Sequence, residues 1–231
     1  MRAALALGIA AGLALAACGA SAAVSLAPEL GVSATVSPAQ ALRTPWAAPL
    51  SVPLLSGGTR TLRSCTDFFG VSKQVSDAID GRDEQVLLGH AVRCEALKAA
   101  AGGRPAARSF VAGWKLGAAG WRTAPPAFDF QFSPDGEAQA KRVTAKGGSA
   151  ADLEKVTVTP KDAFHYLVRG DGWTGDFTIL VRGLDLTGDG VEDLIVSRNV
   201  AATEGTLRAM TYFVVTRTTP NGPLKVVRSF P

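Results

Sequence analysis

The stretch Phe177–Val200, FTILVRGLDLTGDGVEDLIVSRNV, decides the fold that this sequence predicts. Two segments rich in β-branched residues flank a loop of Asp and Gly, which indicates two strands joined by a tight connection. Short apolar runs with turn residues between them lie on both sides: VTVT, FHYLV, MTYFVVTR and LKVVRSF. This spacing favours an antiparallel meander.

Two more strands are predicted upstream of the meander. The segment SFVAGWKLG, residues 109–117, is strand-like, and FDFQF, Phe128–Phe132, alternates strictly between apolar and polar residues. The tripeptide Pro134-Asp135-Gly136 then predicts a turn.

Helices are predicted before the strands. Residues 66–80 carry apolar side chains at helical spacing, and Asp83 can cap a second helix that ends at Gly102-Gly103. The apolar stripe of the second helix is Leu87, Ala91, Cys94 and Leu97. Because helices precede strands, the fold class is predicted as α+β, a helical hairpin (59–104) followed by an antiparallel sheet (105–231) in one domain, 59–231.

The chain has three cysteines, and Cys65 and Cys94 are predicted to form a disulfide that staples the hairpin. Two free thiols or a metal site are the alternatives. His90 lies one helical turn before Cys94, but with only two histidines in the chain a zinc site would lack ligands.

The N-terminus predicts export. Residues 3–17 are uncharged and too short to span a bilayer, as in a secretory signal. The signal ends in Leu15-Ala16-Ala17-Cys18, which resembles the lipobox of bacterial lipoproteins. That resemblance implies removal of residues 1–17, acylation of Cys18 (a palmitate-type anchor) and, because Gly19 follows instead of Asp, placement in the outer membrane. The alternative is an ordinary signal peptide cleaved after Ala22.

Residues 18–58, rich in Pro, Ala and Ser, are predicted to be a tether between the lipid and the folded body. Prolines recur every few residues there, which disfavours helices and central strands. The stretch Trp46–Leu55 is expected to lie extended on the domain surface.

The loop 185–193 carries the pattern of a cation site. Asp185, Thr187, Asp189 and Asp193 occupy positions one, three, five and nine, Gly190 allows a sharp turn at six, and Val191 offers its carbonyl at seven. The loop contains no Lys or Arg to neutralise its carboxylates.

This loop closely resembles the calcium loops of FG-GAP and VCBS-type repeats, in one copy of about 20 residues. The resemblance implies calcium held by Asp185, Thr187, Asp189, Val191 and Asp193, but no propeller, which needs repeated blades. A hydrogen-bonded Asp-Gly turn without metal is the alternative. With Thr at position three, calcium affinity should be low.

Composition and motifs limit the function. The net charge is +4 with Lys and Arg scattered, so no nucleic-acid partner is expected. No catalytic signature is present, and His165, close to Asp162, is interpreted as structural. The sequence predicts a non-enzymatic, lipid-anchored cell-envelope protein, facing the periplasm or the surface, that binds or scaffolds an envelope protein or a glycan. A periplasmic hydrolase is the alternative.

Overall fold

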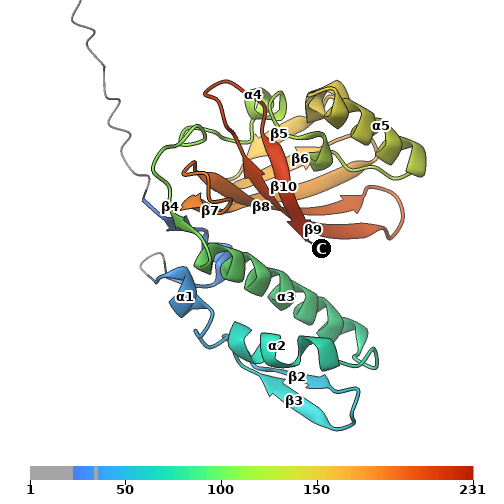
Figure 1. The fold of residues 1–231 in the computed structure, drawn as a ribbon. Helices are drawn as coiled ribbons and strands as arrows, with labels where there is room; N and C mark the ends of the chain where they lie inside the picture. The colour runs from blue at the N-terminus through green and yellow to red at the C-terminus, as the bar shows by residue number, and fades with distance from the viewer. Residues whose placement is uncertain (1–22, 34–35, 231) are drawn as a thin grey trace, which may run out of the picture.

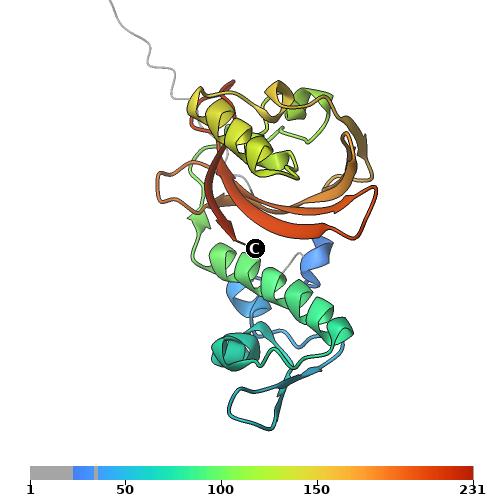
Figure 2. The ribbon, with the colours of Figure 1, turned by 90° about the vertical axis from the view of Figure 1, so that its right-hand side faces the viewer.

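The computed structural model describes residues 23–33 and 36–230, which form three layers (Figures 1 and 2). A curved sheet lies in the middle. The N-terminal part of the chain, with its long helix, covers one face of this sheet, and shorter helices and turns cover the other. No helix of these residues is long and apolar enough to cross a membrane.

The sheet confirms the predicted meander and the α+β fold class. Its main strands are antiparallel and neighbour one another in chain order: β5 (Thr157–Pro160), β6 (His165–Arg169), β7 (Trp173–Asp185), β8 (Asp193–Ala202), β9 (Arg208–Thr216) and β10 (Lys225–Phe230). Two short strands, β1 (Ser25–Leu26) and β4 (Arg104–Pro105), also pair with β7.

Both faces of the sheet bury apolar side chains, since successive strand residues point to opposite sides. On β8, Ile195 belongs to the core beneath the N-terminal layer, whereas Leu194 and Val196 belong to the core on the opposite side. The second core holds most of the large aromatic side chains: Trp114, Trp121, Phe128, Trp173, Phe177 and Phe213.

The helical hairpin forms as predicted, with different bounds. Its helices are α2 (Cys65–Val71), continued by the 3-10 turn η2 (Ser72–Gln74), and α3 (Gly81–Ala101). Asp80, and not Asp83, caps α3, because its carboxylate accepts hydrogen bonds from the backbone N–H groups of Arg82 and Asp83. Cys65 and Cys94 form the predicted disulfide, with Cα atoms 5.2 Å apart.

The tether prediction is wrong for the described part of residues 18–58. This part forms β1, the 3-10 turn η1 (Pro28–Leu30), α1 (Pro38–Ala41) and a hairpin of β2 (Leu50–Pro53) with β3 (Thr59–Leu62). Six of its apolar side chains are buried in the core beneath the sheet: Ala27, Leu30, Ala41, Trp46, Leu50 and Val52. Pro28 and Pro38 begin short helices, where a proline needs no backbone N–H.

The two strands predicted between residues 109 and 132 are also absent. That region contains α4 (Ala118–Trp121) and the 3-10 turn η3 (Pro126–Phe128), and is followed by α5 (Pro134–Ala145) and η4 (Ala150–Asp152). The predicted turn at Pro134 is the first turn of α5, capped by the Ser133 hydroxyl, which accepts from the Gly136 N–H.

Candidate functional site

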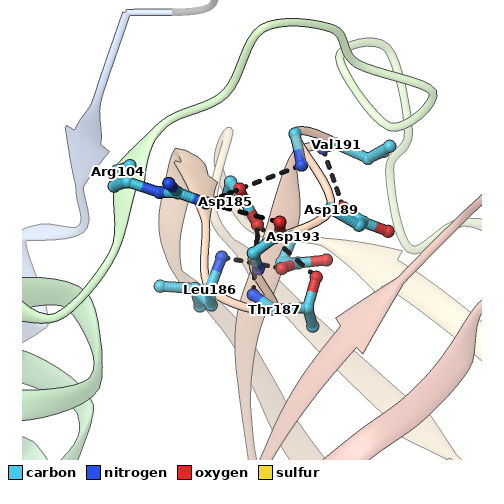
Figure 3. Close-up of polar contacts among 9 residues, drawn as sticks. Arg104, Asp185, Leu186, Thr187, Asp189, Val191 and Asp193 are labelled. Atoms are coloured by element: carbon cyan, nitrogen blue, oxygen red, sulfur yellow. Dashed lines mark hydrogen bonds and ion pairs between the residues drawn. The ribbon is translucent and has the colours of Figure 1, made fainter.

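The loop between β7 and β8 is built around the carboxylate of Asp185, the last residue of β7 (Figure 3). Its Oδ1 accepts from the backbone N–H groups of Thr187 at 3.2 Å and Gly188 at 2.6 Å. Its Oδ2 accepts from the N–H of Gly190 at 2.9 Å. Gly190 has φ of +80°, a conformation that favours glycine, as predicted for position six.

The other two aspartates also fold the loop backbone. Asp189 Oδ1 accepts from the N–H of Val191 at 2.8 Å, and Asp193 Oδ2 accepts from the N–H of Leu186 at 2.8 Å. Asp193 is fully buried, and its Oδ1 makes no hydrogen bond to any described residue. Thr216 pairs with Asp193 across β8 and β9, and its hydroxyl lies close enough to lower the pKa of Asp193, although it does not reach the geometry of a hydrogen bond.

A segment distant in sequence braces the loop. Arg104 in β4 pairs with Asp185, its Nη2 lying 3.3 Å from Oδ2, and it also donates to the Gly188 carbonyl. The N–H groups of Ala107 and Arg108 both donate to the Gly190 carbonyl. Arg104 therefore supplies a cation that the sequence analysis missed, since nothing in the local pattern links it to residue 185.

The environments of Asp185 and Asp193 differ. Burial alone would raise the pKa of Asp185, but hydrogen bonds from Gly190, Gly188 and Thr187, together with Arg104, hold it below its ordinary value. Burial dominates at Asp193 and raises its pKa. The loop thus combines a firmly ionised carboxylate with a buried one that lacks a partner for one oxygen.

The predicted ligands fit a calcium ion only in part. Both Asp185 oxygens are occupied by N–H groups or by Arg104, so the turn satisfies itself. The described residues hold no group of three or more His, Cys, Asp or Glu arranged to bind a metal. Among the predicted ligand carboxylates, Asp193 has a buried oxygen, Oδ1, without a hydrogen bond.

A second candidate site is a cavity of about 530 Å³ between α3 and the sheet, called here the interlayer cavity. It is lined by Glu29 and Leu30 of η1, by Gln85, Val86, Gly89, His90 and Arg93 of α3, and by His165, Asp176, Thr178, Leu180, Ser197, Asn199, Met210 and Tyr212 of the sheet. Its size is typical of pockets that bind small molecules, about 300–1,000 Å³.

His165 lies at the rim of this cavity with a carboxylate on each ring nitrogen. Nδ1 is 2.7 Å from Asp162 Oδ2, and Nε2 is 2.7 Å from Glu29 Oε1. Hydrogen bonds lower the pKa of Asp162 to about 2. The largest contribution comes from the Phe164 N–H, followed by the His165 side chain and the His165 backbone N–H. The imidazole ring thus joins Asp162 to Glu29.

Another buried carboxyl pair lies on the opposite side of the sheet. Burial, followed by a hydrogen bond to Glu154 and the charge of Glu154, raises the pKa of Asp129 to about 7. Glu154 in turn accepts from the indole N–H of Trp173 at 3.0 Å. No motif predicted this pair, because Asp129 lies in FDFQF, which was predicted to be a strand, and Glu154 is distant from it in sequence.

The remaining predicted site residue, Cys18, lies outside the described residues. Comparisons of the chain with protein-family models, with curated proteins and with solved structures gave no match.

Proposed function

We propose that the protein is an exported, lipid-anchored module of the cell envelope that binds a partner and catalyses no reaction. The observation that supports the binding role is the interlayer cavity, which is lined by polar side chains from both α3 and the sheet. The disulfide supports export, since such bonds persist in oxidising compartments. Cys18 supplies the anchor in this proposal, and the loop 185–193 binds calcium weakly, with Asp193 Oδ1 as a ligand.

The early start of the fold brings the body close to the membrane. Ser25 already pairs with Arg182 of β7, and it follows Cys18 by seven positions. An extended chain gains at most about 3.6 Å per residue, so the lipid and the sheet are at most roughly 25 Å apart. The proposed partner therefore lies in the layer next to the membrane, as an envelope protein or glycan does.

The alternative, a periplasmic hydrolase, has one observation in its favour. Asp162 and His165 form the acid–histidine pair that orients a general base. The Nε2 atom that such a base would use, however, is occupied by Glu29 at 2.7 Å, and no hydroxyl or thiol is hydrogen-bonded to it among the described residues. This arrangement favours a structural bridge over a catalytic pair.

Fractionation tests the proposal. The wild-type protein should partition into the detergent phase, and Cys18→Ser should either release the protein or block its maturation. Cys65→Ala, which leaves the anchor intact, is the matched control and should still partition with detergent. A wild-type protein that is water-soluble and begins at Ala23 would contradict the lipid anchor.

A further inference from the structure

The floor of the interlayer cavity is a ladder of polar side chains that crosses the sheet. Strand register places His165 opposite Thr178, Thr178 opposite Ser197, and Ser197 opposite Tyr212. The next row on the same face pairs Asp176 with Asn199. Residues directly opposite on antiparallel strands have Cβ atoms about 5 Å apart, so these groups form a continuous polar surface.

The same face becomes apolar one row further along β7, where Leu180 joins the core under α3. The polar rows face the part of α3 that lines the cavity, from Gln85 to Arg93. Thr178, Ser197 and Tyr212 are buried, whereas Asp176 and Asn199 in the next row are exposed and available to a ligand.

Several of these polar groups have no partner in the protein. The side chains of Asp176 and Asn199 on the sheet and of Gln85 on α3 make no hydrogen bond or ion pair with any described residue, and all three line the cavity. Arg93 donates from Nη2 to the Gly31 carbonyl, but its Nε is buried without a partner. Donors and acceptors from both layers thus converge on one cavity.

Gly89 makes room for a ligand on the helix side. It lies inside α3, one turn from Gln85 and one turn from Arg93, so the three residues share a helix face. A Cβ at position 89 would meet no atom within 4 Å, and hence packing does not require glycine there. Glycine lowers helix stability compared with alanine, but it allows close approach of a ligand to the backbone.

The lining of the cavity carries charges of both signs. Glu29 and Asp176 are acidic, while Arg93 is basic and His165 bridges two carboxylates. A mixed lining selects for neither a strong anion nor a strong cation. Each hydroxyl of a sugar both donates and accepts, which matches alternating amide, carboxylate, hydroxyl and guanidinium groups. Methyl and methylene groups of Leu180 and Met210 offer the apolar contact that sugar rings also need.

From these observations we infer that the interlayer cavity binds a neutral carbohydrate of one or two sugar units. The inference rests on the proposed binding function and names its ligand class. It is independent of the lipid anchor and of the calcium loop, which involve other residues.

A titration of the isotope-labelled full chain by NMR, with maltose, cellobiose and N,N′-diacetylchitobiose as probes, tests this inference. At least one disaccharide should bind saturably and shift the side-chain amide signals of Gln85 and Asn199. Gly89→Leu, which fills the cavity from the helix, and Asp176→Ala should each lower the affinity about tenfold or more. Gly70→Leu, at another open helical position, and Asp171→Ala, an exposed aspartate outside the cavity, are the matched controls.

Three outcomes would overturn the inference: no saturable binding by any of the three disaccharides, binding that Gly89→Leu leaves unchanged in a folded protein, or tighter binding of glucose 6-phosphate than of the neutral sugars. Thermal melting establishes that each variant is folded, and Asn199→Ala replaces Gly89→Leu if the helix variant is not. Failure of sugar binding while the wild type still partitions into detergent removes the ligand assignment and leaves the proposed envelope location standing.

Discussion

The carboxylate of Glu29 reaches Nε2 of His165 at 2.7 Å and so fastens η1, near the start of the described chain, to the first residue of β6. His165 is held from its other side by Asp162. The histidine therefore acts as a bridge between the N-terminal layer and an outer part of the sheet. It also closes one end of the interlayer cavity.

Glu29→Gln should loosen this bridge without unfolding the protein. Both side chains are about one-third exposed, so solvent screening limits the loss in the free energy of unfolding to under about 1 kcal/mol. The local effect should be clearer. We expect faster hydrogen exchange at the Ala27 amide, which donates to the Leu180 carbonyl. Glu84→Gln, on an exposed part of α3, is the control, and equal exchange in both variants would contradict the bridge.

Leu30→Ala tests whether the N-terminal segment belongs to the core. Leu30 is 1% exposed, and removing its side chain should lower the free energy of unfolding by about 2–5 kcal/mol, measured by urea titration. Leu55, which lies in the same predicted tether but is 69% exposed, provides the control in Leu55→Ala. Two equally small effects would restore the tether interpretation.

The disulfide should contribute substantially to stability. Cys65 and Cys94 are 29 residues apart, and closing a loop of this length stabilises a fold by roughly 3–4 kcal/mol in the chain-entropy model. The Cys65→Ala/Cys94→Ala double variant should lose about that much in urea unfolding. Reductant should weaken the wild type and Cys18→Ser equally, and should leave the double variant unchanged. A reductant effect that depends on Cys18 would indicate another pairing.

The sequence predicted the elements whose signals are local. Strands β5 to β10 carry apolar runs separated by turn residues, and α3 carries a stripe with Gly102 at its end. The prediction failed where a local signal has two structural meanings. Prolines every few residues are typical of a linker, but Pro28 and Pro38 occupy the first positions of short helices. Only the burial of Leu30 and its neighbours distinguishes a folded segment from a linker.

The candidate site was predictable only within one segment. The loop 185–193 contains its own turn residues, and Gly190 has the positive φ predicted for it, whereas Asp185, predicted as a calcium ligand, accepts hydrogen bonds from the loop backbone. Its neutralising cation, Arg104, precedes Asp185 by 81 positions and leaves no trace in the local pattern. The same holds for Glu29 beside His165, because tertiary contacts between distant segments depend on the register of the whole sheet.

Asp129 should make stability depend on pH. Its pKa is raised to about 7 in the folded state, chiefly by burial, compared with about 3.9 when unfolded. The folded state therefore holds the extra proton, and the stabilisation is complete below about pH 4 and is lost as pH rises through about 7. At about 1.4 kcal/mol per pKa unit the upper limit is about 4 kcal/mol.

Urea unfolding at about pH 4.5 and about pH 7.5 measures this dependence against Asp129→Asn, which cannot ionise. The wild type should lose more unfolding free energy than the variant when the pH is raised from about 4.5 to about 7.5. Asp135→Asn, at an exposed position of α5, should behave as wild type. Identical pH profiles for wild type and Asp129→Asn would show that the carboxyl is already ionised at low pH.

The last prediction separates a calcium loop from a self-sufficient turn. The backbone of residues 185–193 is satisfied by its own aspartates and by Arg104, whereas Asp193 Oδ1 is buried without a partner. A cation at that oxygen, shared with Asp189 and Thr187, would supply the missing interaction. With a dissociation constant of about 10⁻⁴–10⁻³ M, about 10 mM calcium should stabilise the folded state by roughly 1.4–2.7 kcal/mol and raise the melting temperature.

Asp189→Ala should abolish that rise, whereas Asp171→Ala, in another exposed turn, should keep it. Magnesium should have a smaller effect, because it demands near-ideal octahedral geometry that this irregular loop does not offer. Arg104→Gln should increase the calcium effect, since it frees Asp185 Oδ2 from its ion pair. If calcium leaves the wild-type melting temperature unchanged, the crowding of aspartates is explained by the backbone N–H groups they cap and by Arg104, and Asp193 Oδ1 is an unsatisfied acceptor with no cation.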